Sequence, residues 1–160
     1  MNALADPDVG KYLNNSFVST YQKVGTFRRV GNQKQGGNVA SYFCTPDGRV
    51  LHLVVGPVKA GTLLREARWV VETWKLAQLE EAGDDSHLRT VFRRAHAERF
   101  RQRQKGDVDM QQLAAIRDQP SRVHLLLTLT PLIKLDQAYR MVFEDIVGEK
   151  VSTNPVVEGE

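Results

Sequence analysis

Cysteine is almost absent from this chain of 160 residues, which contains only Cys44. A single cysteine cannot form an intrachain disulfide, a CxxC redox pair or a cysteine-based zinc site. No apolar run approaches the roughly 18–20 residues that a membrane-spanning helix needs. The N-terminus also lacks the basic and apolar regions of a signal peptide. We therefore expect a soluble protein without a membrane span, located in the cytoplasm if Met1 is its true start.

An excess of charge of one sign is also lacking. The sequence has 22 Lys and Arg against 19 Asp and Glu, which gives a formal net charge of +3. This excess is too small to indicate nucleic-acid binding by itself. Hydrophobic residues make up 41% of the chain. That fraction supports a real core and excludes an intrinsically disordered chain.

The clearest local signal is a turn between two apolar runs. Thr45-Pro46-Asp47-Gly48 combines a residue that fixes φ, a side chain that bonds the local backbone and a residue that adopts positive φ. This turn predicts a β-hairpin formed by residues 39–44 and 50–55.

Apolar residues at helical spacing follow the hairpin. They predict helices over residues 59–81, 86–105, 110–117 and 135–147. Residues 121–129 fit a strand or a helix, and we favour a helix. Before the hairpin, Asp6 and Pro7 predict the start of a short helix. Residues 17–24 predict a strand, and the polar, glycine-containing residues 25–37 predict a flexible loop.

Two stretches together resemble the thioredoxin-like fold family. Residues 6–18, DPDVGKYLNNSFV, are similar to the end of the helix after the redox site and the strand that follows it. The hairpin YFCTPDGRVLH, followed by Gly56 and an amphipathic helix, is similar to the second half of the same domain. The resemblance implies an α/β thioredoxin-like fold with an N-terminally incomplete sheet and a β-hairpin in residues 1–82. An α-helical C-terminal extension would then cover residues 84–150, with a flexible tail over residues 151–160.

The departures from that family determine the function we expect. The CxxC of the redox members would lie before Met1, and the position of their cis-proline corresponds to Val39. A valine there is expected to be trans, because a non-proline cis bond costs about 3–4 kcal/mol. We therefore expect a non-catalytic module for protein–protein interaction rather than an enzyme. The alternative is the C-terminal fragment of a thiol–disulfide oxidoreductase whose CxxC lies upstream.

The central strand of the thioredoxin-like sheet is missing as well. The two halves of the sheet could pair directly, or the gap could be filled by the segment around residues 121–129 or by a partner chain. Unpaired buried strand edges are too costly to stay open. A homodimer is therefore one expected arrangement, and another protein is the other expected partner.

Single residues suggest few sites. Cys44 could be a redox-sensitive thiol, although a buried apolar role is favoured. The four histidines are His52, His87, His96 and His124, and no pair has the spacing of a helical metal site. We therefore expect no metal, no cofactor and no catalytic residues in this chain.

One helix is strongly basic. Residues 86–105 hold seven Lys or Arg and a single acid, Glu98. This face could bind an anion or nucleic acid, which is a weaker functional alternative. A solvated or internally paired face is favoured over nucleic acid. The basic residues are Arg89, Arg93, Arg94, Arg99, Arg101, Arg103 and Lys105.

Overall fold

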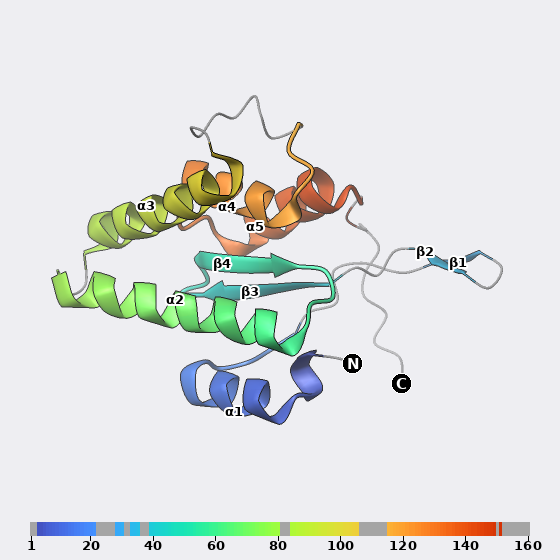
Figure 1. Ribbon diagram of the computed structural model, residues 1–160, viewed down its shortest axis with the longest axis horizontal. Coiled ribbons are helices and arrows are strands. Elements are labelled where there is room, and N and C mark those ends of the chain that lie inside the picture. The colour runs from blue at the N-terminus through green and yellow to red at the C-terminus, as the bar shows by residue number, and fades with distance from the viewer. Residues whose placement is uncertain are drawn as a thin grey trace.

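The computed structural model describes residues 3–21, 28–30, 33–35, 39–80, 84–105, 115–149 and 151. These residues form a mixed α/β structure that is mostly helical (Figure 1). The α-helices are α1 (Pro7–Ser16), α2 (Ala60–Glu80), α3 (Asp85–Gln104), α4 (Gln119–Leu129) and α5 (Leu135–Met141). A 3-10 turn, η1 (Ala3–Ala5), precedes α1, and a π-helical segment, η3 (Val142–Val147), continues α5. The α/β class is confirmed, while the thioredoxin-like fold stays a prediction.

The predicted hairpin is confirmed. Strands β3 (Ala40–Cys44) and β4 (Val50–Val55) pair in antiparallel register, with Ala40 opposite Val55. Gly48 has the positive φ of 79° that the turn requires, and its N–H donates to the carbonyl of Thr45. Leu51 has no partner in the register, because Phe43 faces His52 and Cys44 faces Val50. The hairpin therefore contains a β-bulge at Leu51.

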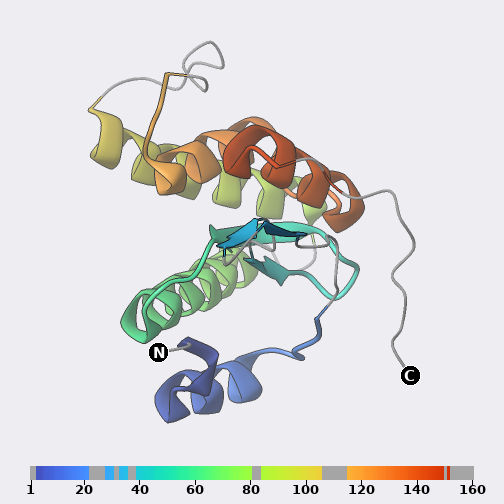
Figure 2. The same cartoon turned by 90° about the vertical axis from the view of Figure 1, so that its right-hand side faces the viewer.

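The hairpin lies between two helical layers, which Figure 2 shows edge-on. Helices α1 and α2 pack together on one side, and α3, α4 and η3 pack on the other. Strand β4 contacts both α2 and α4 and is buried along almost its whole length. Two large hydrophobic clusters result, one around Val70 and Phe92 and the other around Leu53 and Val142, and a smaller third one contains Phe100 and Leu125. This arrangement makes β4 the central element of the core.

Aspartate side chains cap the N-termini of three of the described helices. Asp6 accepts hydrogen bonds from the first backbone N–H groups of α1, as predicted. Asp84 caps α3 and Asp118 caps α4 in the same way. These caps satisfy N–H groups that have no partner within the helix. The predicted helices over residues 59–81, 86–105, 121–129 and 135–147 are confirmed within one or two residues at most ends, with a π-helical final segment in the last.

Three predictions for the irregular parts of the chain are wrong where the structure describes them. Residues 17–21 form no strand, and residues 22–24 lie outside the described ranges. The predicted loop contains an antiparallel pair, β1 (Arg28–Val30) and β2 (Gln33–Gln35). Residues 115–117 are not helical, and residues 110–114 of that predicted helix lie outside the described ranges. These segments are short, so local composition and periodicity are weak guides to their structure.

The segment between α4 and α5 forms backbone hydrogen bonds with the turn end of the hairpin. The N–H of Val50 donates to Ile133, and Gly48 accepts from the N–H of Leu135. Residues 121–129 are helical, so they do not supply the missing strand. The domain boundary expected between residues 82 and 84 stays a prediction. Helix α2 precedes this boundary and α4 follows it, yet both contact β4. None of the described helices has the length and apolarity to cross a membrane, which agrees with the expectation from sequence.

Candidate metal centre

Three of the four histidines come together in the core. His52 lies on β4, His96 on α3 and His124 on α4. Their exposed fractions are 3%, 1% and 2%. One nitrogen atom from each ring lies within 4.8 Å of the others. The sequence analysis expected no metal site, because these residues are far apart in the chain. The fold brings them into one buried cluster, which we call the histidine cluster.

The β-bulge at Leu51 helps to position this cluster. A bulged residue has no partner across the ladder, so its carbonyl can bond elsewhere. The Nε2–H of His96 donates to the Leu51 carbonyl at 2.9 Å. A carbonyl oxygen only accepts, so this bond places the proton of neutral His96 on Nε2. The lone pair of His96 is then on Nδ1.

Glu66 of α2 orients the second histidine. The Nε2–H of His52 donates to the Glu66 carboxylate at 3.2 Å. The Glu66 side chain is only 10% exposed, and it also pairs with the Arg99 guanidinium. Burial opposes ionisation of Glu66, but the hydrogen bonds from His52 and Arg99 outweigh it and lower the pKa to about 2. Glu66 is therefore a carboxylate at neutral pH, and the lone pair of His52 is on Nδ1.

The three histidines are neutral in the folded protein. Burial is the main cause that lowers the pKa of His52, of His96 and of His124, and for His96 the value falls to about 3. The positive charge of Arg99 lowers all three further. Neutral imidazole is the form that binds metal ions. Each ring therefore has the charge state that a metal ligand needs, and on metal binding the His124 proton between the two Nδ1 atoms would have to leave that position.

The Nδ1 atoms of His52, His96 and His124 differ in their hydrogen bonds. The Nδ1 atoms of His96 and His124 are 2.9 Å apart, so the His124 Nδ1–H donates to the His96 lone pair. The Nδ1 of His52 is buried and has no hydrogen-bond partner among the described residues. A buried lone pair without a donor is uncommon in folded proteins. It marks the position where a further electrophilic group, such as a cation, would bind.

The spacing of the rings fits a tetrahedral metal ion. The ring centroids are 5.5 Å apart for His52 and His96, 5.4 Å for His52 and His124, and 5.2 Å for His96 and His124. Zinc–nitrogen bonds of about 2.05 Å at tetrahedral angles place imidazole centroids about 5.2 Å apart and the ligand nitrogens about 3.3 Å apart. The Nδ1 atoms of His96 and His124, which are 2.9 Å apart, would have to move slightly apart to bind the same ion. The ligand nitrogens lie within 4.8 Å of one another, and the rings of His52 and His124 are nearly parallel, at 9°, so these rings would have to turn to bind one ion.

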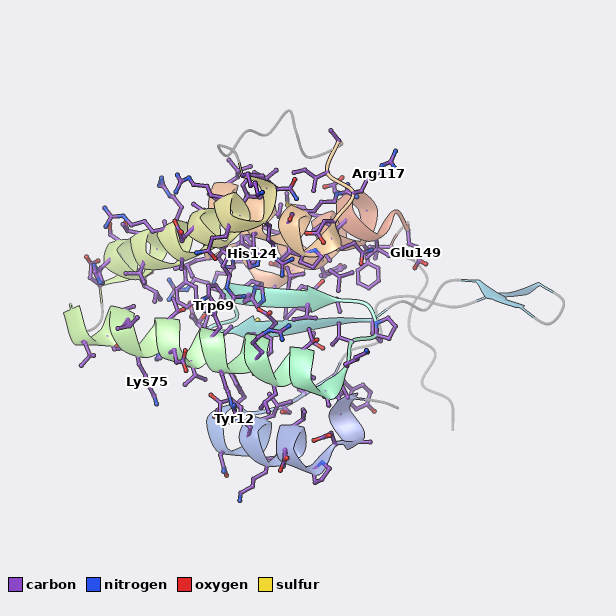
Figure 3. The ribbon with its side chains drawn as sticks, in the orientation of Figure 1. Tyr12, Trp69, Lys75, Arg117, His124 and Glu149 are labelled. Carbon is purple, nitrogen blue, oxygen red and sulfur yellow. The ribbon has the colours of Figure 1, made fainter. Side chains whose placement is uncertain are left out.

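Trp69 forms one wall of the cluster. Its ring lies edge-on to His52 and to His96, with centroid distances of 5.1 Å in both cases. Figure 3 shows Trp69 from α2 and His124 from α4 beside β4. The Arg99 guanidinium lies over the Trp69 ring, 3.9 Å from its centroid. The tryptophan therefore contacts both the cluster and that cation.

Cys44 and Val39 do not belong to this cluster. Cys44 is partly buried at the end of β3, and burial raises the pKa of its thiol to about 11. The thiol is thus protonated at neutral pH, which does not favour redox reactivity. Val39 is 57% exposed just before β3, and no cis peptide bond occurs in the described part of the chain. The roles predicted for these two residues stay predictions.

The basic residues of α3 divide between its faces. Arg99 reaches Glu66, Arg103 lies near Asp118, and Arg89 donates to the carbonyl of Pro131. Arg93, Arg94, Arg101 and Lys105 are exposed. Arg93, Arg94 and Arg101 line a pocket of about 590 Å³ between α3 and α4. Part of the basic face is therefore paired within the protein, and binding of an anion or nucleic acid by this face stays a prediction.

The histidine cluster could not be found from spacing. His52 and His96 are 44 residues apart, and His96 and His124 are 28 apart (96 − 52 and 124 − 96). The available signal was that each lies at an apolar, core-facing position of its element, as in VLHLVV and VHLLLTL. Glu66 was missed as well, because nothing local distinguishes it from the other acids of α2. Comparisons with protein-family models, with curated proteins and with solved structures found no match to this chain.

Proposed function

We propose that this protein binds one divalent transition-metal ion, with zinc favoured, through His52, His96 and His124. The observation that carries the proposal is the pair of outer hydrogen bonds, from His52 to Glu66 and from His96 to the Leu51 carbonyl. Metal-binding histidines characteristically donate their other ring N–H to a carboxylate or a backbone carbonyl. Both bonds direct the Nδ1 lone pairs toward the common centre.

The ion would join three elements of the core. It would connect the central strand β4 to α3 and to α4, beside Trp69 of α2. Three protein ligands leave a fourth coordination position for water or a substrate atom. Imidazole nitrogens suit zinc, copper, iron and nickel, and tetrahedral spacing favours zinc among them.

Metal content of the full chain tests this proposal. After dialysis against zinc and removal of free metal, we expect about one zinc per chain by elemental analysis. His52→Ala, His96→Ala and His124→Ala should each reduce this content strongly. His87→Ala is the matched control, since His87 lies at the start of α3 outside the cluster, and it should retain the metal.

A second measurement covers the case in which a variant fails to fold. Histidine ring nitrogen resonances of the unaltered protein should shift for three residues on addition of zinc, and those of His87 should not. A stoichiometry near zero, or shifts confined to His87, would refute the proposal. The protein-interaction, oxidoreductase-fragment and nucleic-acid functions predicted from the sequence stay predictions.

A further inference from the structure

A pocket lies next to the Glu66 carboxylate. It has a volume of about 300 Å³ and is formed between α2 and α3. Its lining residues are Arg65, Glu66, Arg99, Gln102 and Arg103. Glu66 thus contacts His52 and also lines this pocket.

The pocket lining is strongly positive. Three guanidinium groups face one carboxylate, an excess of two positive charges (3 − 1). Arg99 is fixed by Glu66 and by the ring of Trp69. Arg65 lies 3.7 Å from the Glu66 carboxylate, but its side chain is 64% exposed and that of Arg103 is 41% exposed, so both can turn toward a ligand. Asp118, 3.6 Å from Arg103, lies outside the lining and offsets only part of this charge.

We propose that this pocket binds the phosphate group of a small phosphate monoester. Guanidinium groups bind phosphate oxygens through paired, charge-assisted hydrogen bonds. The Gln102 amide lies in the same lining; it donates one N–H to Glu98 at 2.9 Å, and its second N–H can donate to a ligand. The pocket exceeds the volume of a phosphate group, so space remains for the organic part of the ligand.

The phosphate site is coupled to the metal, a step that rests on the proposed zinc function. The neutral histidines add no charge, so bound zinc adds two positive charges on the far side of Glu66. Zinc therefore strengthens the attraction of the pocket for an anion. We expect the monoester to bind at least about fivefold more tightly to the zinc-loaded protein, and zinc to bind more tightly by the same factor when the monoester is present.

Calorimetric titration of the full chain with glycerol phosphate tests the inference, once with metal-free protein and once with zinc-loaded protein. The double variant Arg65→Gln/Arg103→Gln should weaken binding by about tenfold or more, because each lost guanidinium removes a charge-assisted hydrogen bond. Arg93→Gln/Arg94→Gln is the matched control. These two exposed arginines lie on α3 outside the pocket lining, and their loss should leave binding unchanged.

The outcomes separate the two proposals. Zinc content measured on the same samples tests the metal site, and titration of the metal-free protein tests the pocket without it. Zinc binding without monoester binding would overturn only the phosphate site. Equal weakening in both double variants would overturn it too, as would binding of a single-stranded oligonucleotide by a protein that does not bind glycerol phosphate. Monoester binding that zinc does not strengthen would refute the coupling.

Discussion

The stability of the metal-free protein should fall steeply between pH 7 and pH 5. The histidine cluster keeps three imidazoles neutral, because burial lowers their pKa values below the ordinary value of 6.5. In the unfolded chain the same residues take up protons as the pH falls through 6.5. Unfolding therefore binds protons in this range, and the free energy of unfolding decreases as the pH decreases.

The magnitude follows from proton linkage. A histidine that stays neutral in the folded protein down to pH 5 contributes a loss of about 2 kcal/mol between pH 7 and pH 5. Three such residues would give at most about 6 kcal/mol, a large part of the about 5–15 kcal/mol that stabilises an ordinary domain. Glu66 adds little in this window. Its pKa is lowered from 4.5 to about 2, so its contribution is present above pH 4.5 and is lost only below it.

Urea denaturation at pH 7, 6 and 5, with EDTA present and with tryptophan fluorescence as the signal, measures this loss. His124→Gln should be less stable at pH 7 but should lose about 2 kcal/mol less over the same range. His87→Gln should retain the slope of the unaltered protein. A total loss below about 2 kcal/mol would show that at most one histidine is held neutral, and would refute the account of the cluster.

The remaining predictions concern single side chains. Glu66→Gln removes the carboxylate that orients His52 and should weaken zinc binding about 10–100-fold in a competition titration with a chelator, whereas exposed Glu72→Gln on the same helix should not. Gly48→Ala forces a side chain to adopt a φ of 79° and should destabilise the protein by about 1 kcal/mol or more in urea; an unchanged midpoint would contradict the turn. Leu53→Ala removes a side chain that is 1% exposed and should cost about 2–5 kcal/mol, so a cost below 1 kcal/mol would show that β4 is not central to the core.

Local signals in the sequence were sufficient for the regular elements. The hairpin followed from the Pro46-Asp47-Gly48 turn, and Asp6 with Pro7 indicated where α1 begins. Turn and cap chemistry act between neighbouring residues, so one sequence contains the information. The β1–β2 pair was missed because three-residue polar strands have no hydrophobic alternation to detect.

The site depended on packing between distant segments. The clustering of His52, His96 and His124 requires β4 to lie against both α3 and α4, and no local pattern specifies that arrangement. The Leu51 carbonyl adds a contact that depends on a backbone irregularity rather than on a side chain. A histidine in an apolar segment therefore indicates a buried polar site, but the sequence does not identify the residues that it contacts.

The extra residue in β4 has a consequence for tolerance to deletion. Removing Leu51 would restore a regular ladder, with Cys44 opposite Val50 and Phe43 opposite His52. It would also eliminate the carbonyl that accepts the hydrogen bond from His96. A hairpin shortened in this way would be more regular but would lose the contact that orients His96. Length variation in this protein should therefore be tolerated in its loops and not within β4.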